Sequence, residues 1–333
     1  MRIDQNRTVL AIMFFAVIVS GCTGGGNQEE TSSTASVQVN EFSAFPNPTP
    51  SGQKTRFRMQ LVNQGDAEAR NTSVRLYNPP FADNGTTDTK TWRDGSTGNV
   101  SIEDRTLFFD TLSAPSDQTP AVPKTRTRTY TAPELDQGRT ISYDWNAYMM
   151  FEYQTDANTE IQIMGGEQYR EQGSPSGSAS LENSRGPIKM EVRTPTPIVF
   201  YDVNRNNNPE RQLCVIIRNQ GNGIPFAEEP SSNNIYMNRS DTGYTYNLSA
   251  VQEQENKVNV RIEDIGNVDF EPFDSSNDQK TVDILSGKGV QCWDMKVDVS
   301  GSSIQTTVPL SLEAVYNYRK STKTTATVEG RRQ

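Results

Sequence analysis

The three cysteines are the side chains of this chain best suited to covalent chemistry. Cys22 closes an apolar run, whereas Cys214 and Cys292 lie in the second half among residues typical of strands. Histidine is absent, which removes the usual general base, the nucleophile pairs that depend on imidazole, and the imidazole ligands of most catalytic zinc sites. No Asp or Glu stands in an apolar setting that marks it as a catalytic acid. We therefore expect no enzyme activity and no cofactor.

The first 22 residues predict export from the cell. Residues 1–7 are short and basic, and Thr8–Gly21 is uncharged and apolar. This run is too short for a comfortable membrane span, which takes roughly 20 apolar residues. The sequence Val19-Ser20-Gly21-Cys22 resembles a lipoprotein signal box, which implies cleavage after residue 21 and a lipid on the Cys22 thiol. An ordinary cysteine beside a plain signal peptide, or an uncleaved anchor, is the alternative.

The segment after Cys22 has the composition of a flexible tether. Residues 22–36 are rich in Gly, Ser and Thr and contain no large apolar side chain, so they cannot bury a core. We expect the membrane to be a partner through the lipid, and the protein to lie lipid-anchored on the extracellular face of the cell membrane. The net charge of −9 and the pI near 4.8 argue against nucleic acid as a partner.

The remainder of the chain reads as short strands. Segments of alternating polar and apolar residues recur between turn signals, as at Ser36–Asn40, Val74–Tyr77, Val258–Ile262 and Met295–Val299. No amphipathic helix longer than three turns is evident. Many short strands separated by turns indicate an all-β fold of the β-sandwich kind.

Two landmarks indicate that a module occurs twice. The segment Phe57–Gly65 parallels Leu213–Gly221, and each ends in Asn-Gln-Gly, residues suited to a tight turn. Phe151-Glu-Tyr153 is followed by Ile163, and Tyr316-Asn-Tyr318 is followed at the same distance by Val328. The order and spacing of both landmarks predict a tandem repeat.

These landmarks predict the domain organisation. We expect a signal peptide at 1–21, a tether with the lipidated cysteine at 22–36, a first sandwich at 37–164 and a second sandwich at 187–329. The Gly-, Ser- and Glu-rich residues 165–186 are interpreted as the linker.

The strand pattern resembles a known family. Pro48-Thr-Pro-Ser-Gly52, Leu61–Gly65, Ala69 and Val74–Tyr77 are similar to the immunoglobulin-like modules of cell-adhesion-related (CARDB-type) surface proteins. The second half keeps Arg218–Gly221 and departs from the pattern afterwards. The resemblance implies two immunoglobulin-like sandwiches on a cell surface and an archaeal source as one interpretation, and it carries no catalytic residue.

Cys214 and Cys292 form an even pair once Cys22 is lipidated. In an oxidising compartment such a pair predicts a disulfide. Their spacing resembles the bridge between the two sheets of immunoglobulin-type sandwiches, with Trp293 packed beside it. Two buried free thiols are the alternative.

Two segments are weak candidates for a metal site. Asp202, Asn204 and Asn206 place oxygen atoms at alternate positions, like the opening of a calcium loop. The loop lacks glycine at its sixth position and has Leu213 where a glutamate is needed, so a turn-rich Asn run explains it equally well. The acidic residues 263–278 are a second candidate, although such a run is more often a solvated loop.

Trp92 lies in a polar segment and is the candidate ligand aromatic. Exposed on a loop, it could stack on a sugar or anchor a protein; a partly buried loop residue is the alternative.

The sequence thus predicts a non-catalytic surface lipoprotein in adhesion, envelope scaffolding or partner binding. The alternative is an accessory lipoprotein that captures carbohydrate or another substrate for a transporter or secreted enzyme.

Overall fold

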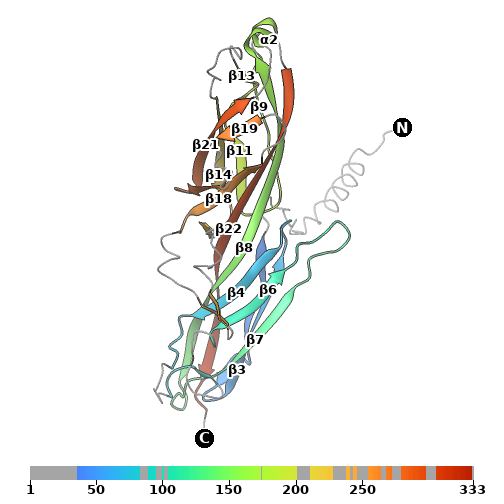
Figure 1. The fold of residues 1–333 in the computed structure, drawn as a ribbon. Helices are drawn as coiled ribbons and strands as arrows, with labels where there is room; N and C mark the ends of the chain where they lie inside the picture. The colour runs from blue at the N-terminus through green and yellow to red at the C-terminus, as the bar shows by residue number, and fades with distance from the viewer. Residues whose placement is uncertain are drawn as a thin grey trace, which may run out of the picture. The chain divides into compact units, whose positions relative to one another are not determined.

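The fold is built almost entirely from β-strands, which confirms the predicted all-β class (Figure 1). The structure is a computed structural model. It describes residues 36–82, 89–94, 100, 104–173, 175–200, 211–227, 238–240, 243–245, 254–263, 268–271, 279–297 and 305–331. Among these residues the only helix is α2 (Gly166–Glu171), which directly follows a long strand.

The strands of the first half include one that is far longer than the others. They are β1 (Val37–Phe45), β2 (Thr49–Pro50), β3 (Lys54–Asn63), β4 (Ala69–Tyr77), β5 (Arg93–Asp94), β6 (Thr106–Leu112), β7 (Lys124–Thr131) and β8 (Thr140–Gly165). With 26 residues, β8 is much longer than the short strands that the sequence pattern predicted.

The second half also ends in a long strand, β22 (Gln305–Glu329). Before it come β9 (Gly177–Ser178), β10 (Glu182–Asn183), β11 (Ile188–Val192), β12 (Pro195–Thr196), β13 (Ile198–Phe200), β14 (Arg211–Asn219), β15 (Ile224–Ala227), β16 (Asn238–Ser240), β17 (Gly243–Thr245), β18 (Lys257–Glu263), β19 (Val268–Glu271), β20 (Gln279–Asp283) and β21 (Lys288–Val297).

A single ten-stranded sheet joins the two halves. Its main order is β20-β18-β22-β8-β4-β6, and β2, β10, β13 and β15 pair with the two long strands. Each half adds a four-stranded sheet of its own, β1-β3-β7-β5 in the first and β11-β14-β21-β19 in the second. The remaining pairs are β9 with β12 and β16 with β17.

The long strands β8 and β22 pair along their whole lengths, as Figure 1 shows. The antiparallel register runs from Thr140 opposite Glu329 to Met164 opposite Gln305 without a bulge. Each long strand therefore contributes one end to the first half and the other end to the second half.

One face of this pair supplies the core in both halves. Along β8 the core residues fall at odd positions from Trp145 to Ile163, and along β22 at even positions from Val308 to Val328. Successive side chains of a strand alternate between the two faces of a sheet, so this parity keeps the apolar side chains on one face. Phe57 and Trp145 fill the core of the first half, and Leu213 and Met295 lie in the second.

The turns that follow Asn63 and Asn219 make the same hydrogen bonds. Asn63 Oδ1 accepts a hydrogen bond from the Gly65 N–H at 3.1 Å, and Asn63 Nδ2 donates one to the Ala67 carbonyl at 2.7 Å. The same atoms of Asn219 receive the Gly221 N–H at 3.2 Å and donate to the Gly223 carbonyl at 2.8 Å.

The second landmark also occupies equivalent places, one in each long strand. Tyr153 lies opposite Tyr316, and Phe151 lies opposite Tyr318. This register places an approximate two-fold axis through the Glu152–Asn317 pair, and rotation about it exchanges β8 with β22.

The predicted linker, 165–186, contains regular structure. It holds α2, β9 and β10, and β10 pairs with β8 at Asn158 and Ala157. The chain from Ser33 to Gln333 forms one compact unit. The division into two separate domains at 164 and 187 stays a prediction.

Candidate functional site

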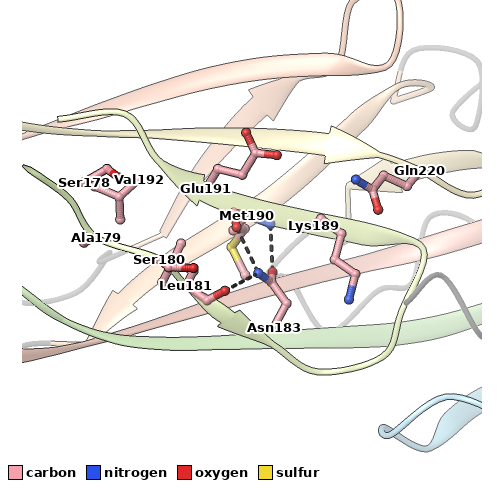
Figure 2. Close-up of a pocket in the computed structure, with 10 residues that line it drawn as sticks. All are labelled: Ser178, Ala179, Ser180, Leu181, Asn183, Lys189, Met190, Glu191, Val192 and Gln220. Atoms are coloured by element: carbon pink, nitrogen blue, oxygen red, sulfur yellow. Dashed lines mark hydrogen bonds between the residues drawn. The ribbon is translucent and has the colours of Figure 1, made fainter. Parts of the chain in front are cut away.

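A groove of about 480 Å³ lies beside the edge strand β11 (Figure 2). The segment from Ser178 to Asn183 forms one wall, and β11 forms the other. This segment is tied at one end by β9, which pairs with β12, and at the other by β10, which pairs with β8. The lining residues are Ser178, Ala179, Ser180, Leu181, Asn183, Lys189, Met190, Glu191, Val192 and Gln220.

The side-chain amide of Asn183 hydrogen-bonds to the backbone of Met190 at the free edge of β11, as a neighbouring strand would. Its Oδ1 accepts the Met190 N–H at 2.8 Å, and its Nδ2 donates to the Met190 carbonyl at 3.0 Å (Figure 2). Nδ2 also donates to the Leu181 carbonyl at 3.2 Å. One amide therefore satisfies both backbone groups that Met190 directs outward from the sheet edge.

Lys189 is the cation of this groove. It is buried, and its Nζ donates to the Ser184 carbonyl at 2.8 Å. Burial lowers the pKa of Lys189, and the negative charge of Asp66 opposes that shift. Glu191 is exposed and forms an ion pair with Arg218, with 2.9 Å between Glu191 Oε1 and Arg218 Nε.

The groove is lined by groups that can bind a ligand. Its walls combine hydroxyl, amide and charged groups with the apolar side chains of Leu181, Met190 and Val192. Small ligand sites commonly join an apolar floor to a few polar groups in this way. The site was not predicted from the sequence, because the Gly-, Ser- and Glu-rich residues 165–186 were interpreted as a linker. The alternation that starts at Ile188, directly after Pro187, was the available signal.

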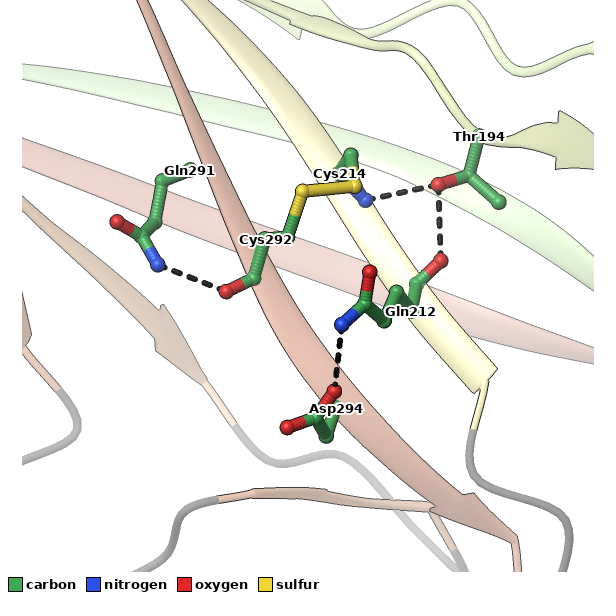
Figure 3. The surroundings of a disulfide bond; sticks show 6 residues. All are labelled: Thr194, Gln212, Cys214, Gln291, Cys292 and Asp294. Carbon is green, nitrogen blue, oxygen red and sulfur yellow. Dashed lines mark hydrogen bonds between the residues drawn. A yellow bond between two sulfur atoms is a disulfide. The ribbon is translucent and has the colours of Figure 1, made fainter.

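The structure confirms the disulfide between Cys214 and Cys292 (Figure 3). It corrects the expectation of a bridge between two sheets, because the cysteines lie directly opposite each other in β14 and β21 of one sheet. The Cys214 N–H donates to Thr194 Oγ1 at 2.7 Å, and its carbonyl accepts the Arg193 N–H at 2.8 Å. Both groups thus point away from β21, and such pairs bring the Cα atoms of neighbouring strands closest; here they are 4.0 Å apart.

Trp293 does not pack beside the bridge as expected. It belongs to the core with Leu213, whereas the adjacent Cys292 is half-buried on the opposite face of the sheet. The bridge is surrounded by polar groups, among them a 2.9 Å hydrogen bond from Gln212 Nε2 to Asp294 Oδ1 (Figure 3). Strand alternation explains the difference, since neighbours along β21 point to opposite faces.

Trp92 is fully buried, so the expectation of an exposed ligand aromatic is wrong. Its ring lies edge-on to Trp145, with ring centres 5.0 Å apart, and edge-on to Phe57 at 5.8 Å. Its backbone N–H donates to the Pro80 carbonyl at 2.9 Å. Packing against these aromatic rings overrides the polar character of its sequence neighbours.

The remaining predicted site residues fall outside the residues that the structure describes. These are Cys22 and the calcium candidates Asp202, Asn204 and Asn206. Within the described part of the chain, no group of three or more Cys, Asp or Glu side chains is placed to hold a metal ion. None of the helices in that part has the length and apolar character to cross a bilayer.

No protein-family model and no curated protein sequence matches this chain.

Proposed function

We propose that this chain is a non-catalytic surface lipoprotein. Cleavage after residue 21 leaves Cys22 as the lipidated residue, and the repeats at 37–164 and 187–329 are immunoglobulin-like sandwiches of the cell-adhesion-related kind. They act in adhesion, envelope scaffolding or partner binding on the extracellular face of the cell membrane. The observation that carries the proposal is the apolar run Thr8–Gly21, which stops at Cys22 and gives way to a polar tether.

The pairing of β8 with β22 supports a scaffolding role. All 25 residues of β22 face a residue of β8. At about 3.3 Å per residue, this ladder measures about 80 Å. A continuous ladder resists shear because many hydrogen bonds must break together, which suits a protein that carries force between a membrane and a partner.

The disulfide supports the proposal that the protein lies in an oxidising compartment. Cys214 and Cys292 are joined, and such bonds persist outside the reducing cytosol. The protein would then present its modules beyond the membrane, in the compartment to which a signal peptide directs it.

Intact-mass measurement of the protein purified from its native membrane tests the proposal. We expect a chain that starts at Cys22, carries a diacylglyceryl group and gains two hydrogens on reduction. Cys22→Ser should release the protein from the membrane fraction, whereas the matched variant Cys214→Ser should stay there. A mass that retains Met1 or lacks lipid would overturn the assignment.

The groove beside β11 favours the alternative, capture of a carbohydrate or another small substrate. Glu191 and Gln220 supply donors and acceptors of the kind that sugar hydroxyls need. Titration with oligosaccharides, followed by the NMR shifts of the Asn183 and Gln220 side-chain amides, tests this function. Ser180→Trp should fill the groove and abolish the shifts, and a wild-type protein that shows none rules it out.

A further inference from the structure

Tyr77 and Tyr148 form a stacked pair on the ten-stranded sheet, outside the hydrophobic core. Their ring centres are 4.1 Å apart, and the ring planes are inclined by 16°. Tyr77 is half-buried, and Tyr148 is 37% exposed. At this separation carbon atoms of the two rings are in van der Waals contact, while part of the pair remains open to solvent.

Three neighbouring strands hold the two rings in place. Tyr77 of β4 lies opposite Asn146 of β8, two residues before Tyr148, so the two tyrosines are diagonal neighbours on one face of the sheet. From β22, on the other side of β8, the Arg319 guanidinium lies over the Tyr148 ring at 5.3 Å. Arg319 is itself held by Glu255, with 2.9 Å between Nη2 and Oε1. Tyr148 is therefore held between a second phenol and a fixed cation.

The two hydroxyl groups lie at the same end of the stack. Burial and, second, a hydrogen bond with the Tyr148 side chain raise the pKa of Tyr77 to about 12. The hydrogen-bonding group of each side chain is its phenol hydroxyl, so the rings are stacked in the same sense. The ring carbons next to the hydroxyls, the ortho carbons, therefore face one another.

Other tyrosine pairs of the described chain lack this combination of contact and access. The ring centres of Tyr153 and Tyr316 are 6.2 Å apart, and those of Tyr316 and Tyr318 are 6.1 Å apart. All three of these side chains are fully buried. An oxidant in solvent reaches Tyr148 and does not reach these rings.

We propose that Tyr77 and Tyr148 are a cross-linking site, at which a one-electron oxidant such as a peroxide-driven haem peroxidase joins the two rings by a carbon–carbon bond. The bond ties β4 covalently to β8, in addition to their ladder of hydrogen bonds. It suits the oxidising compartment in which the disulfide persists, and its formation requires neither lipid on Cys22 nor a surface partner.

The reaction balances without further reactants. Each phenol loses one electron to the oxidant and its hydroxyl proton to solvent, which leaves two neutral phenoxyl radicals. Their ortho carbons form one carbon–carbon bond, and the hydrogen on each of these carbons then moves to the oxygen of its own ring. Both phenols are thereby restored. The chain loses two hydrogen atoms, and one hydrogen peroxide is reduced to two water molecules.

Treatment of the purified full chain with a haem peroxidase and hydrogen peroxide tests the site. After dithiothreitol, which restores only the hydrogens of the disulfide, we expect a monomer that is still two hydrogens lighter than its sequence. It should show dityrosine fluorescence and yield a proteolytic product that joins Tyr77 to Tyr148. Tyr77→Phe and Tyr148→Phe keep both rings, and each should abolish this product. Tyr169→Phe is the matched control, and it should cross-link like the wild type.

Four results would overturn the proposal. The first is a wild-type monomer without dityrosine. The second is a linked product that survives Tyr148→Phe or that joins other tyrosines. The third is a product found in dimers, with a yield that rises with protein concentration, which would mean that separate chains react. The fourth is an equal yield of the Tyr77–Tyr148 product from the urea-unfolded chain, which would show that the folded stack plays no part. Far-ultraviolet circular dichroism reports whether each variant is folded.

Discussion

The hydroxyl of Tyr318 donates a 2.9 Å hydrogen bond to Asn219 Oδ1 and accepts the Gly223 N–H at 2.9 Å. It thereby fastens the turn after β14 to the long strand β22. Asn219 in turn receives the Gly221 N–H, so one hydroxyl and one amide hold three positions of the turn. A close approach requires glycine here, since a Cβ on Gly221 would lie 2.2 Å from the Tyr318 hydroxyl oxygen.

Tyr318→Phe should lower the free energy of unfolding by about 1–3 kcal/mol. The substitution keeps the buried ring and leaves Asn219 Oδ1 and the Gly223 N–H short of a partner. Urea unfolding measures the change. Tyr169→Phe is the control, because the structure gives the Tyr169 hydroxyl no bond to any described residue, and it should unfold like the wild type. Equal midpoints for both variants would contradict this role of Tyr318.

The stability of the protein should fall at alkaline pH. Burial raises the pKa of Tyr318 to about 12, against about 10 for tyrosine in an unfolded chain. Between these values the folded state holds a proton that the unfolded state has released, so the free energy of unfolding falls as the pH rises from about 10 to about 12. Below pH 10 this contribution is present in full.

Urea unfolding at a series of pH values measures the effect. Tyr77 adds to it, since burial raises its pKa to about 12 as well. Tyr318→Phe should flatten the fall without removing it. A variant whose stability falls as steeply as that of the wild type would show that Tyr318 does not titrate in this range.

The likeness of the turns after Asn63 and Asn219 was predictable because its signal is local. Asn63 and Asn219 each end an alternating strand with Asn-Gln-Gly, and the turn chemistry of these residues is written in three positions of sequence. The lengths of β8 and β22 were not predictable in this way. Ser321–Thr325 contains no apolar residue that would mark a buried strand, yet it continues β22 because β8, which is distant in sequence, pairs with it.

The candidate sites, too, could be predicted only in part from local sequence. The sequence paired Cys214 with Cys292 correctly, but the sheet that holds them depends on the register of β14 with β21, which no local pattern specifies. Trp92 was placed on a surface loop from its polar neighbours, and its burial depends on Phe57 and Trp145, which are distant in sequence. The groove beside β11 likewise depends on two separate pairings of a Ser-rich segment that looks like a linker.

Loss of the disulfide should destabilise the protein without changing its strands. The bond closes a loop with a sequence separation of 78 residues, worth about 4.5 kcal/mol in the chain-entropy model. The double variant Cys214→Ala, Cys292→Ala should therefore unfold at lower urea and keep its far-ultraviolet circular dichroism, because β14 and β21 pair over eight positions. Dithiothreitol should shift the wild type by a similar amount and leave the double variant unchanged. A double variant as stable as the oxidised wild type would contradict the expectation.

The two repeats should unfold together. Phe57→Ala removes a fully buried ring from the first half and should cost about 3–5 kcal/mol. Because β8 and β22 each run through both halves, that loss should also speed amide exchange at Leu213 and Val215 in the second half. Met295→Ala is the reciprocal variant, and it should speed exchange at Met59 and Leu61. Exposed Val122→Ala is the matched control, which should leave both sets of amides unchanged. Two separate urea transitions, each sensitive to one substitution only, would instead establish the repeats as independent domains with boundaries near 164 and 187.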